Sequence, residues 1–267
     1  MDKNIKNQIK ESLKKTIRKY FHSIKSKRNY QVLDLIFPVE RRIRSLIGGL
    51  ETSLGTTFWE PVAKILARQN GFQIINDKIL CPQPFPQIIQ NELNQLINER
   101  ETKPNAKILL TEECIKRLKS AALKINSQEI IAYKSPPSGT GVDIHLFKDG
   151  IKYVFDIKTP QPNVGDFKRF NKQLLEWYAY KFVKYPNAHF EARISIPFNP
   201  FEHSWYTHQR NKLSNCPLDV DRDIWVGDEF WDFCSGMTNT SKYLENIFKE
   251  IGEENLSQEF SDIFYGK

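Results

Sequence analysis

Between residues 142 and 159 the chain carries two short runs rich in β-branched and aromatic side chains. Residues 142–147 largely alternate apolar with polar positions, and residues 151–159 form a longer, mainly apolar run. Both patterns are typical of β-strands. The dipeptide Asp149-Gly150 stands between them and favours the tight turn of a hairpin. The pattern therefore predicts an antiparallel β-hairpin over residues 142–159.

The start of the chain has the period of a helix instead. Apolar side chains recur at every fourth position of residues 2–28, at Ile5, Ile9, Leu13, Ile17 and Phe21. This spacing predicts an amphipathic helix. Its polar face is basic, with Lys10, Lys14, Arg18 and Lys25. That face is either a solvated surface or a contact for a DNA backbone or a second copy of the chain, and the pattern leaves both interpretations open.

The remaining chain predicts helices and strands in alternation. Helices are expected over residues 32–50, 60–70, 91–100, 111–124, 166–184 and 243–251. Gly48-Gly49 is expected to end the first of these and Gly71 the second. Residues 81–88 contain three prolines and predict an extended connection. A strand over residues 189–198 follows a helix, which favours parallel pairing with the hairpin. The expected fold class is α/β (α+β), a mixed central sheet flanked by helices.

Two carboxylates and a lysine lie at the ends of the hairpin strands. Asp156 and Lys158 are two positions apart and share a strand face. The hairpin places Asp143 across from them. Two carboxylates supply the hard oxygen ligands that Mg²⁺ prefers, and an adjacent ammonium stabilises charge on a phosphate. The alternative is that Asp143 caps a turn and that Asp156 and Lys158 belong to a solvated strand face.

Composition agrees with a polyanionic partner. The 267 residues carry a net charge of +7 and are 40% hydrophobic, enough for a substantial core. The apolar runs are too short to span a membrane, and the first residues lack the apolar stretch of a signal peptide. We therefore expect a cytoplasmic protein without a membrane partner. The four cysteines are widely separated, which argues against a zinc or iron–sulfur site and for reduced thiols.

These residues resemble a known nuclease core. Gly141-Val142-Asp143 followed by Asp156-Ile157-Lys158 is similar to the PD-(D/E)xK motif of many type II restriction endonucleases, with Val142 in place of the proline. The resemblance covers roughly residues 50–200. It implies a restriction-endonuclease-like fold and Mg²⁺-dependent hydrolysis of double-stranded DNA to 5′-phosphate and 3′-hydroxyl ends. Asp143 and Asp156 would bind the metal, and Lys158 would orient or activate water.

The same resemblance draws attention to two more residues. Members often carry an acidic residue on a helix before the hairpin, and Glu60 in Phe-Trp-Glu-Pro fits that position. An equally good interpretation is that Glu60 is a first-turn acid favoured by the helix dipole. Members also often carry a polar residue on the helix after the strand, and Gln173 fits there as a supporting residue. Trp177 occupies the tyrosine position of the Gln-x-x-x-Tyr helix found in recombination-type exonucleases, which departs from that subgroup.

The overall layout looks most like the TdeIII-type group of restriction enzymes. That subgroup resemblance implies a short palindromic target of the GGNCC kind. A palindrome has two-fold symmetry and two strands to cut, so we expect a homodimer. A cognate DNA methyltransferase is expected in the same system, without a stable complex.

We expect three parts along the chain: a basic helical region at residues 1–50, the nuclease core at 51–200, and a C-terminal elaboration at 201–267 that packs on the core. Candidate phosphate contacts near the active site are Lys168, Arg169 and Lys172. Base-reading candidates in the polar segment 199–215 are Gln209, Arg210, Asn211 and Lys212. The alternative for that segment is an ordinary surface loop.

Two other functions stay open on the sequence alone. One is a PD-(D/E)xK nuclease of repair or recombination type, and the other is a DNA-binding protein without catalysis. The absence of helicase motifs and the position of Trp177 argue against the first. Mg²⁺-dependent cutting would exclude the second.

Overall fold

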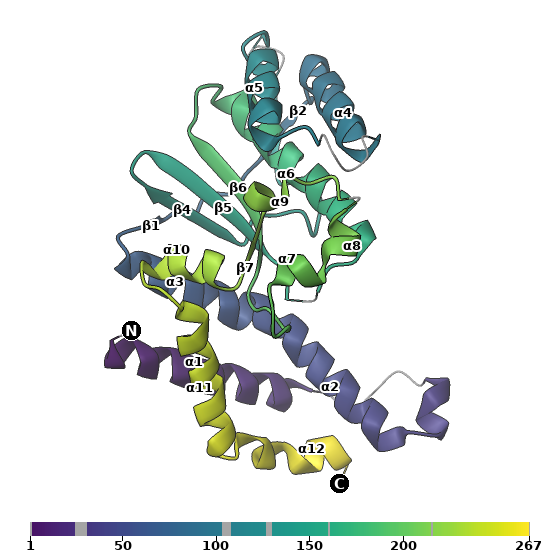
Figure 1. Ribbon diagram of the computed structural model, residues 1–267, viewed down its shortest axis with the longest axis vertical. Helices are drawn as coiled ribbons and strands as arrows, with labels where there is room; N and C mark the ends of the chain where they lie inside the picture. The colour runs from purple at the N-terminus through teal and green to yellow at the C-terminus, as the bar shows by residue number, and fades with distance from the viewer. Residues whose placement is uncertain are drawn as a thin grey trace.

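A five-stranded mixed sheet forms the centre of the molecule (Figure 1). The computed structural model describes residues 2–24, 31–102, 108–126, 130–159, 161–214 and 216–266. The strand order is β1-β4-β5-β6-β7, and a separate two-stranded sheet pairs β2 with β3. The strands are β1 (Gln73–Ile74), β2 (Cys81–Gln83), β3 (Ala132–Lys134), β4 (Ile144–Lys148), β5 (Ile151–Ile157), β6 (Phe190–Ile196) and β7 (Ile224–Val226).

The predicted hairpin is confirmed. Strands β4 and β5 are antiparallel, with Ile144 opposite Phe155 and Lys148 opposite Ile151. Asp149 and Gly150 have φ values of 51° and 80°, as a tight hairpin turn with two left-handed positions requires. Strand β6 pairs parallel with β5, which confirms the crossover through the intervening helix. The predicted α/β class with a mixed sheet is therefore correct.

Helices cover both faces of this sheet (Figure 1). The longer ones are α1 (Lys3–Ser23), α2 (Pro38–Leu54), α3 (Glu60–Gln69), α4 (Gln87–Thr102), α5 (Thr111–Ala122), α6 (Val164–Lys184), α10 (Asp228–Ser235) and α11 (Thr240–Glu253). Helices α4, α5 and α6 share one core with Val154 and Ile194. Helices α1, α3, α10 and α11 share the other core with Ile144 and Phe155. Because neighbouring residues of a strand face opposite ways, the two cores lie on opposite sides of the sheet.

The second predicted helix differs from expectation. Residues Val32–Leu35 form a short 3₁₀ helix, η1, and α2 then runs through Gly48 and Gly49 instead of ending there. A side chain at Gly49 would collide with the hydroxyl of Tyr20, which donates a hydrogen bond to the carbonyl of Leu46 at 2.9 Å. Gly49 therefore permits the close approach of α1, and it is not a helix end. A single π-turn, η2 (Gly55–Trp59), joins α2 to α3.

The last third of the chain is more ordered than its sequence indicated. The segment expected to be irregular contains the short helices α7 (Trp205–His208) and α8 (Arg210–Leu213). Helix α9 (Val220–Asp223) leads into β7, a strand of three residues that the pattern did not predict. The chain ends in η4 (Leu256–Phe260) and α12 (Ser261–Tyr265). Gly71, by contrast, follows α3 with a φ of 80°, as predicted.

The basic face of α1 lies against the acidic end of the chain. Lys10 and Lys14 both pair with Glu254, at 2.8 Å and 2.5 Å, and Arg18 pairs with Glu259 at 2.7 Å. Hydrogen bonds from the two lysines lower the pKa of Glu254 to about 2. These cations therefore have partners inside the molecule, and a role of α1 in DNA contact or dimerisation stays a prediction. Lys25 lies outside the described residues.

The expectations for the cysteines and for membrane spans can be compared with the structure. All four cysteines are free, in agreement with the prediction of reduced thiols. Among the described helices, none is both long and apolar enough to cross a membrane.

A buried arginine joins four helices on the α6 side of the sheet. Arg100 of α4 is 2% exposed and donates to Asp223 of α9 at 3.0 Å, to Asn171 of α6 at 3.2 Å and to Thr111 of α5 at 2.7 Å. Thr111 also donates to Asp223 at 2.6 Å. Burial raises the pKa of Asp223, which shows how strongly this carboxylate depends on its partners. The network therefore fixes α6 relative to the helices behind it.

We predict that Arg100→Met lowers the free energy of unfolding by about 3–5 kcal/mol, because it leaves the charge of Asp223 buried without a counter-ion. Urea denaturation at neutral pH measures this. Arg117→Met is the matched control, since Arg117 pairs with Glu92 and Glu99 at the partly exposed surface and its loss should cost about 1 kcal/mol or less. Equal effects of the two substitutions would contradict the assignment.

Candidate active site

The two predicted carboxylates meet at one end of the hairpin. The amide of Asp143 donates to the carbonyl of Phe155 at 3.0 Å, which extends the β4–β5 pairing by one residue. The Asp143 carboxylate then accepts the amide proton of Ile157 at 2.8 Å. Asp156, the residue before, is only 3% exposed. A single side-chain bond thus ties the start of β4 to the end of β5 and brings both acids to the same place.

Asp156 is held from two sides. One of its oxygens, Oδ2, lies 2.6 Å from the Lys158 ammonium and accepts a hydrogen bond from the Gln173 amide of α6 at 2.8 Å. The Lys158 backbone amide donates to the Ser195 carbonyl of β6 at 2.9 Å, so the lysine is placed by the sheet. The structure therefore brings together four predicted site residues: Asp143, Asp156, Lys158 and Gln173.

The environment of this pair is unfavourable to a second negative charge. Burial, followed by the neighbouring charge of Asp156, raises the pKa of Asp143 to about 6. The Ile157 amide and the Lys158 ammonium act in the opposite direction but do not cancel these effects. Above about pH 6 the Asp143 carboxylate is therefore ionised beside the Asp156 side chain in a partly desolvated place. A cation between them would relieve this repulsion.

The donor set fits a magnesium ion. Mg²⁺ is commonly held by one or two carboxylates, with waters and substrate phosphates in its other positions. The part of the chain that the structure describes contains no cluster of three or more histidine, cysteine or acidic side chains suited to a metal. The pair Asp143 and Asp156 matches a hard cation that keeps several waters, and it does not match a structural zinc site, which needs four protein ligands.

The contacts of Glu60 differ from those of Asp143, Asp156, Lys158 and Gln173. It begins α3, whose buried residues belong to the core on the opposite side of the sheet from Gln173. Its carboxylate forms an ion pair with Lys64, one turn further along the same helix. The structure thus pairs Glu60 with Lys64 and Lys158 with Asp156. A role for Glu60 at the metal or beside Lys158 stays a prediction.

One positioning contact was not foreseen from the sequence. Trp177 of α6 is buried, and its indole N–H donates to the carbonyl of Thr140 at 2.8 Å. Thr140 stands three residues before Asp143, so this bond fixes the loop that leads into the first carboxylate. The available signal was that a buried tryptophan needs an acceptor for its N–H. What the sequence did not show was which acceptor it would reach.

The three phosphate-contact candidates on α6 are exposed. The side chains of Lys168, Arg169 and Lys172 are 57%, 61% and 62% exposed. Arg169 pairs with Asp166 at 2.8 Å, while the other two lie 3.8–4.0 Å from acidic neighbours. Exposed pairs of this type are weak, so these cations stay available to a polyanion.

The four base-reading candidates divide into two groups. Arg210, Asn211 and Lys212 are exposed on α8. Gln209, at the junction of α7 and α8, is buried at 3% exposure. A base-reading role for Gln209 stays a prediction, and it would require the α7–α8 junction to expose the Gln209 amide.

The α7–α8 segment contacts the loop that follows Lys158. The indole N–H of Trp205 donates to the Gln161 side chain at 2.7 Å. Trp205 is 2% exposed, so this bond lies in the protein interior. The Lys212 ammonium lies 3.5 Å from the carbonyl of Pro162. The exposed polar residues of α8 are therefore anchored next to the candidate active site.

Comparison with known proteins adds an independent finding. Residues 1–252 match the family model described as type II restriction endonuclease, HinfI. The chain is 25% identical to the type II restriction enzyme MjaII of Methanocaldococcus jannaschii over 235 residues, which are 80% of this chain and 56% of that enzyme. It is 24% identical to the type II restriction enzyme HgiCII of Herpetosiphon aurantiacus over 220 residues, 81% of this chain and 75% of that enzyme. The chain thus spans about half the length of the first relative. No solved structure matches it significantly.

We predict that Asp143→Asn raises the melting temperature of the metal-free protein at pH 8. The raised pKa of Asp143 means that the folded state binds this proton more tightly than the unfolded state. The ionised carboxylate therefore destabilises the fold above about pH 6, and asparagine removes its charge while keeping an acceptor for Ile157. Below about pH 4 both states carry the proton, and the two proteins should melt alike. Thermal unfolding at both pH values in chelator measures this, and a variant that melted lower than wild type at pH 8 would refute it.

Proposed function

The chain belongs to the HinfI family of type II restriction endonucleases, and from that premise we propose that it hydrolyses double-stranded DNA at a short specific site with Mg²⁺, leaving 5′-phosphate ends. One observation carries the proposal: the half-buried Asp143 and the buried Asp156 adjoin a lysine ammonium that lies 2.6 Å from Asp156. That arrangement suits a divalent ion and the negative charge that develops on a phosphate under attack.

Each residue of the site has a distinct proposed role. Asp143 and Asp156 would hold Mg²⁺, which when bound lowers the pKa of a coordinated water and polarises the scissile phosphate. Lys158 orients the attacking water and stabilises negative charge near Asp156. Gln173 donates to Asp156 and so fixes the direction in which its carboxylate points. Glu60 is proposed as an assisting acid, which would require it to exchange Lys64 for the metal shell or Lys158.

The DNA contacts are proposed in two sets. The exposed cations Lys168, Arg169 and Lys172 of α6 would contact backbone phosphates, which position the duplex without reading its sequence. The exposed side chains of α8, Arg210, Asn211 and Lys212, would reach base edges. Their anchoring to the loop after Lys158, through Trp205 and Gln161, supports a recognition element beside the cutting site. A GGNCC-type palindrome, proposed from the TdeIII-type resemblance, is the first target to test.

A homodimer is proposed, because a two-fold symmetric protein matches a palindrome and cuts both strands. A candidate contact is the apolar arm, defined here as η1 and the start of α2. Val32, Leu35 and Ile36 are 74%, 74% and 66% exposed there, and Phe37 is 49% exposed. Contiguous exposed apolar side chains of this kind favour burial against another protein surface. In Figure 1 the arm projects away from the sheet, where a second copy could reach it.

Two further proposals concern the setting of the enzyme. We propose a cytoplasmic location, where cellular DNA and any invading duplex are accessible. We also propose a cognate DNA methyltransferase that protects the host's own sites without forming a stable complex.

A nuclease of repair or recombination type is the alternative function, and a DNA-binding protein without catalysis is the second. A closed circular plasmid separates them, since an enzyme that requires free DNA ends leaves it intact. The site-specific enzyme proposed here would yield discrete fragments, and a binding protein would yield none.

We predict that Asp156→Asn and Lys158→Met each lower the rate of Mg²⁺-dependent plasmid cleavage by about a hundredfold or more, because each removes a charge at the reacting phosphate. Both substitutions keep the size of the side chain. Gel analysis of the cleaved plasmid over time gives the rate. Lys242→Met is the control, since Lys242 is 72% exposed on α11 and pairs with nearby Glu245. Unchanged rates for both site variants would overturn the catalytic assignment.

We predict that the double substitution Leu35→Asp with Ile36→Asp converts a dimer into monomers, because it places four charges at a two-fold contact. Sedimentation velocity at micromolar concentration measures the change. The control is the double substitution Leu123→Asp with Ile131→Asp, which changes the same residue types at positions 66% and 87% exposed. It should leave the sedimenting mass of the protein unchanged. A wild-type chain that sediments as a monomer, or a dimer that survives the arm substitutions, would refute this contact.

A further inference from the structure

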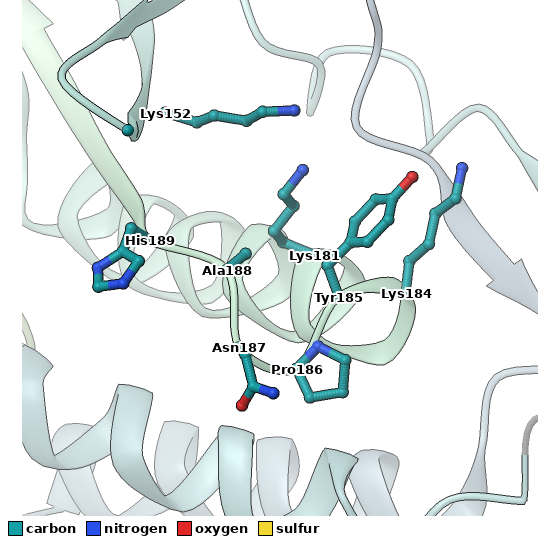
Figure 2. Close-up of a pocket in the computed structure, with 9 residues that line it drawn as sticks. Lys152, Lys181, Lys184, Tyr185, Pro186, Asn187, Ala188 and His189 are labelled. Atoms are coloured by element: carbon teal, nitrogen blue, oxygen red, sulfur yellow. The ribbon is translucent and has the colours of Figure 1, made fainter.

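A second charged site lies at the opposite end of the sheet from the carboxylate pair. A hollow of about 480 Å³ opens between the β4–β5 turn and the C-terminal end of α6. Its lining includes Lys152 of β5, Lys181 and Lys184 of α6, and Tyr185 and His189 of the connection to β6. In Figure 2 the Lys181 side chain extends from the helix toward Lys152 on the strand. Three ammonium groups from two elements therefore border one space.

A smaller hollow of about 240 Å³ adjoins the first and shares its three lysines. Its lining adds Asp77 and His145. The His145 ring is buried, with Nδ1 3.1 Å from the carbonyl of Asp77, while its Nε2 has no hydrogen-bond partner among the described residues. A buried polar atom without a partner is uncommon in native proteins. The two hollows are thus lined by four lysines, Lys78, Lys152, Lys181 and Lys184, together with Asp77.

These lysines have no carboxylate partners in the part of the chain that the structure describes. Where other lysines form ion pairs, as Lys10 does with Glu254, Lys181 and Lys184 lie near aromatic rings. The Lys181 ammonium is 4.7 Å from the centre of the Tyr185 ring, and Lys184 is 5.3 Å from the same ring. Cation–π contacts leave most of an ammonium's hydrogen-bonding capacity unused.

The helix end does not account for this clustering. The C-terminus of α6 carries about half a negative charge. That charge compensates at most part of one nearby ammonium, and three ammonium groups border the hollow. Burial, then Lys152 and Lys184, lower the pKa of Lys181 to about 8. Asp77 acts in the opposite direction, but it is the smallest of the contributions. The fold therefore holds Lys181 in a place where its charge is disfavoured unless an anion is present.

We propose that this hollow is a binding site for the phosphate group of an anionic ligand, separate from the catalytic pair. Four residues along β5 separate Lys152 from Asp156, about 13 Å at the rise of a strand, so one phosphate cannot contact both. A phosphate suits the site better than a carboxylate does, because it carries more charge and offers several oxygens to three donors. The same chemistry can come from a free di- or triphosphate or from the backbone of DNA beyond the cut site.

Amine labelling of the full-length protein tests the proposal without relying on nuclease activity. At pH 8 about half of an amine with a pKa near 8 is unprotonated, against well under one per cent of an ordinary lysine. Lys181 should therefore react with acetic anhydride about a hundredfold faster than Lys242, as read by peptide mass spectrometry. An anion that raises the pKa of Lys181 by one unit would cut its labelling about fivefold.

Two probes distinguish the sources of phosphate. Inorganic pyrophosphate is the first, and a duplex oligonucleotide, added in chelator so that it is not cut, is the second. Protection of Lys181 by pyrophosphate identifies a small-anion site. Protection by the duplex alone identifies a backbone contact. If neither probe slows labelling of Lys181, the proposal is wrong.

A matched pair of variants completes the test. Lys184→Gln removes one cation at the rim of the hollow and should weaken protection by the effective probe about tenfold, the expected loss for one charge-assisted hydrogen bond. Lys242→Gln removes the same charge from α11 and should leave protection unchanged. Equal weakening by both variants would show a general effect of net charge and would overturn the site.

Discussion

The close approach of two acids at one end of a hairpin is the constraint on which the rest of this structure depends. Burial first, and then the charge of Asp156, raise the pKa of Asp143, so ionising it there carries a cost. The surrounding fold keeps them together in spite of it. The Ile157 amide binds Asp143, and Lys158 and Gln173 bind Asp156. These contacts and the strand pairing on both sides hold the two acids in place.

The support for these acids comes from the layers around the sheet. Helix α6 supplies Gln173 to one carboxylate and Trp177 to the loop before the other, so its position controls both. The buried Arg100 network fixes α6 from behind. On the other side, the ion pairs between α1 and the acidic end of the chain hold the first and last helices together. The core that these helices share with the sheet therefore draws on both ends of the chain.

Helix α6 also connects two sites of opposite charge. Gln173 lies in its first half, beside the carboxylates, while Lys181 and Lys184 lie in its last turn, beside Lys152. Strand pairing brings the two acids together, and the packing of α6 on β5 brings the lysines together. Uncompensated charge in a hollow is a common property of sites that bind ions or ligands of opposite sign. The carboxylate end suits a cation, and the lysine end suits a phosphate.

The sequence by itself determined the hairpin, the crossover to β6 and the meeting of Asp143, Asp156 and Lys158, because local alternation and an Asp-Gly turn set the register of a strand pair. The resemblance to the PD-(D/E)xK nucleases also indicated Gln173. Only the tertiary structure decided that α2 continues through Gly49, that Gln209 is buried, and that Trp177 reaches Thr140. It likewise brought β7 into the sheet and gathered three lysines at one hollow. These outcomes depend on which distant segments pack together. Neither the hydrophobic period of the chain nor the helix or strand propensity of a single residue encodes that choice.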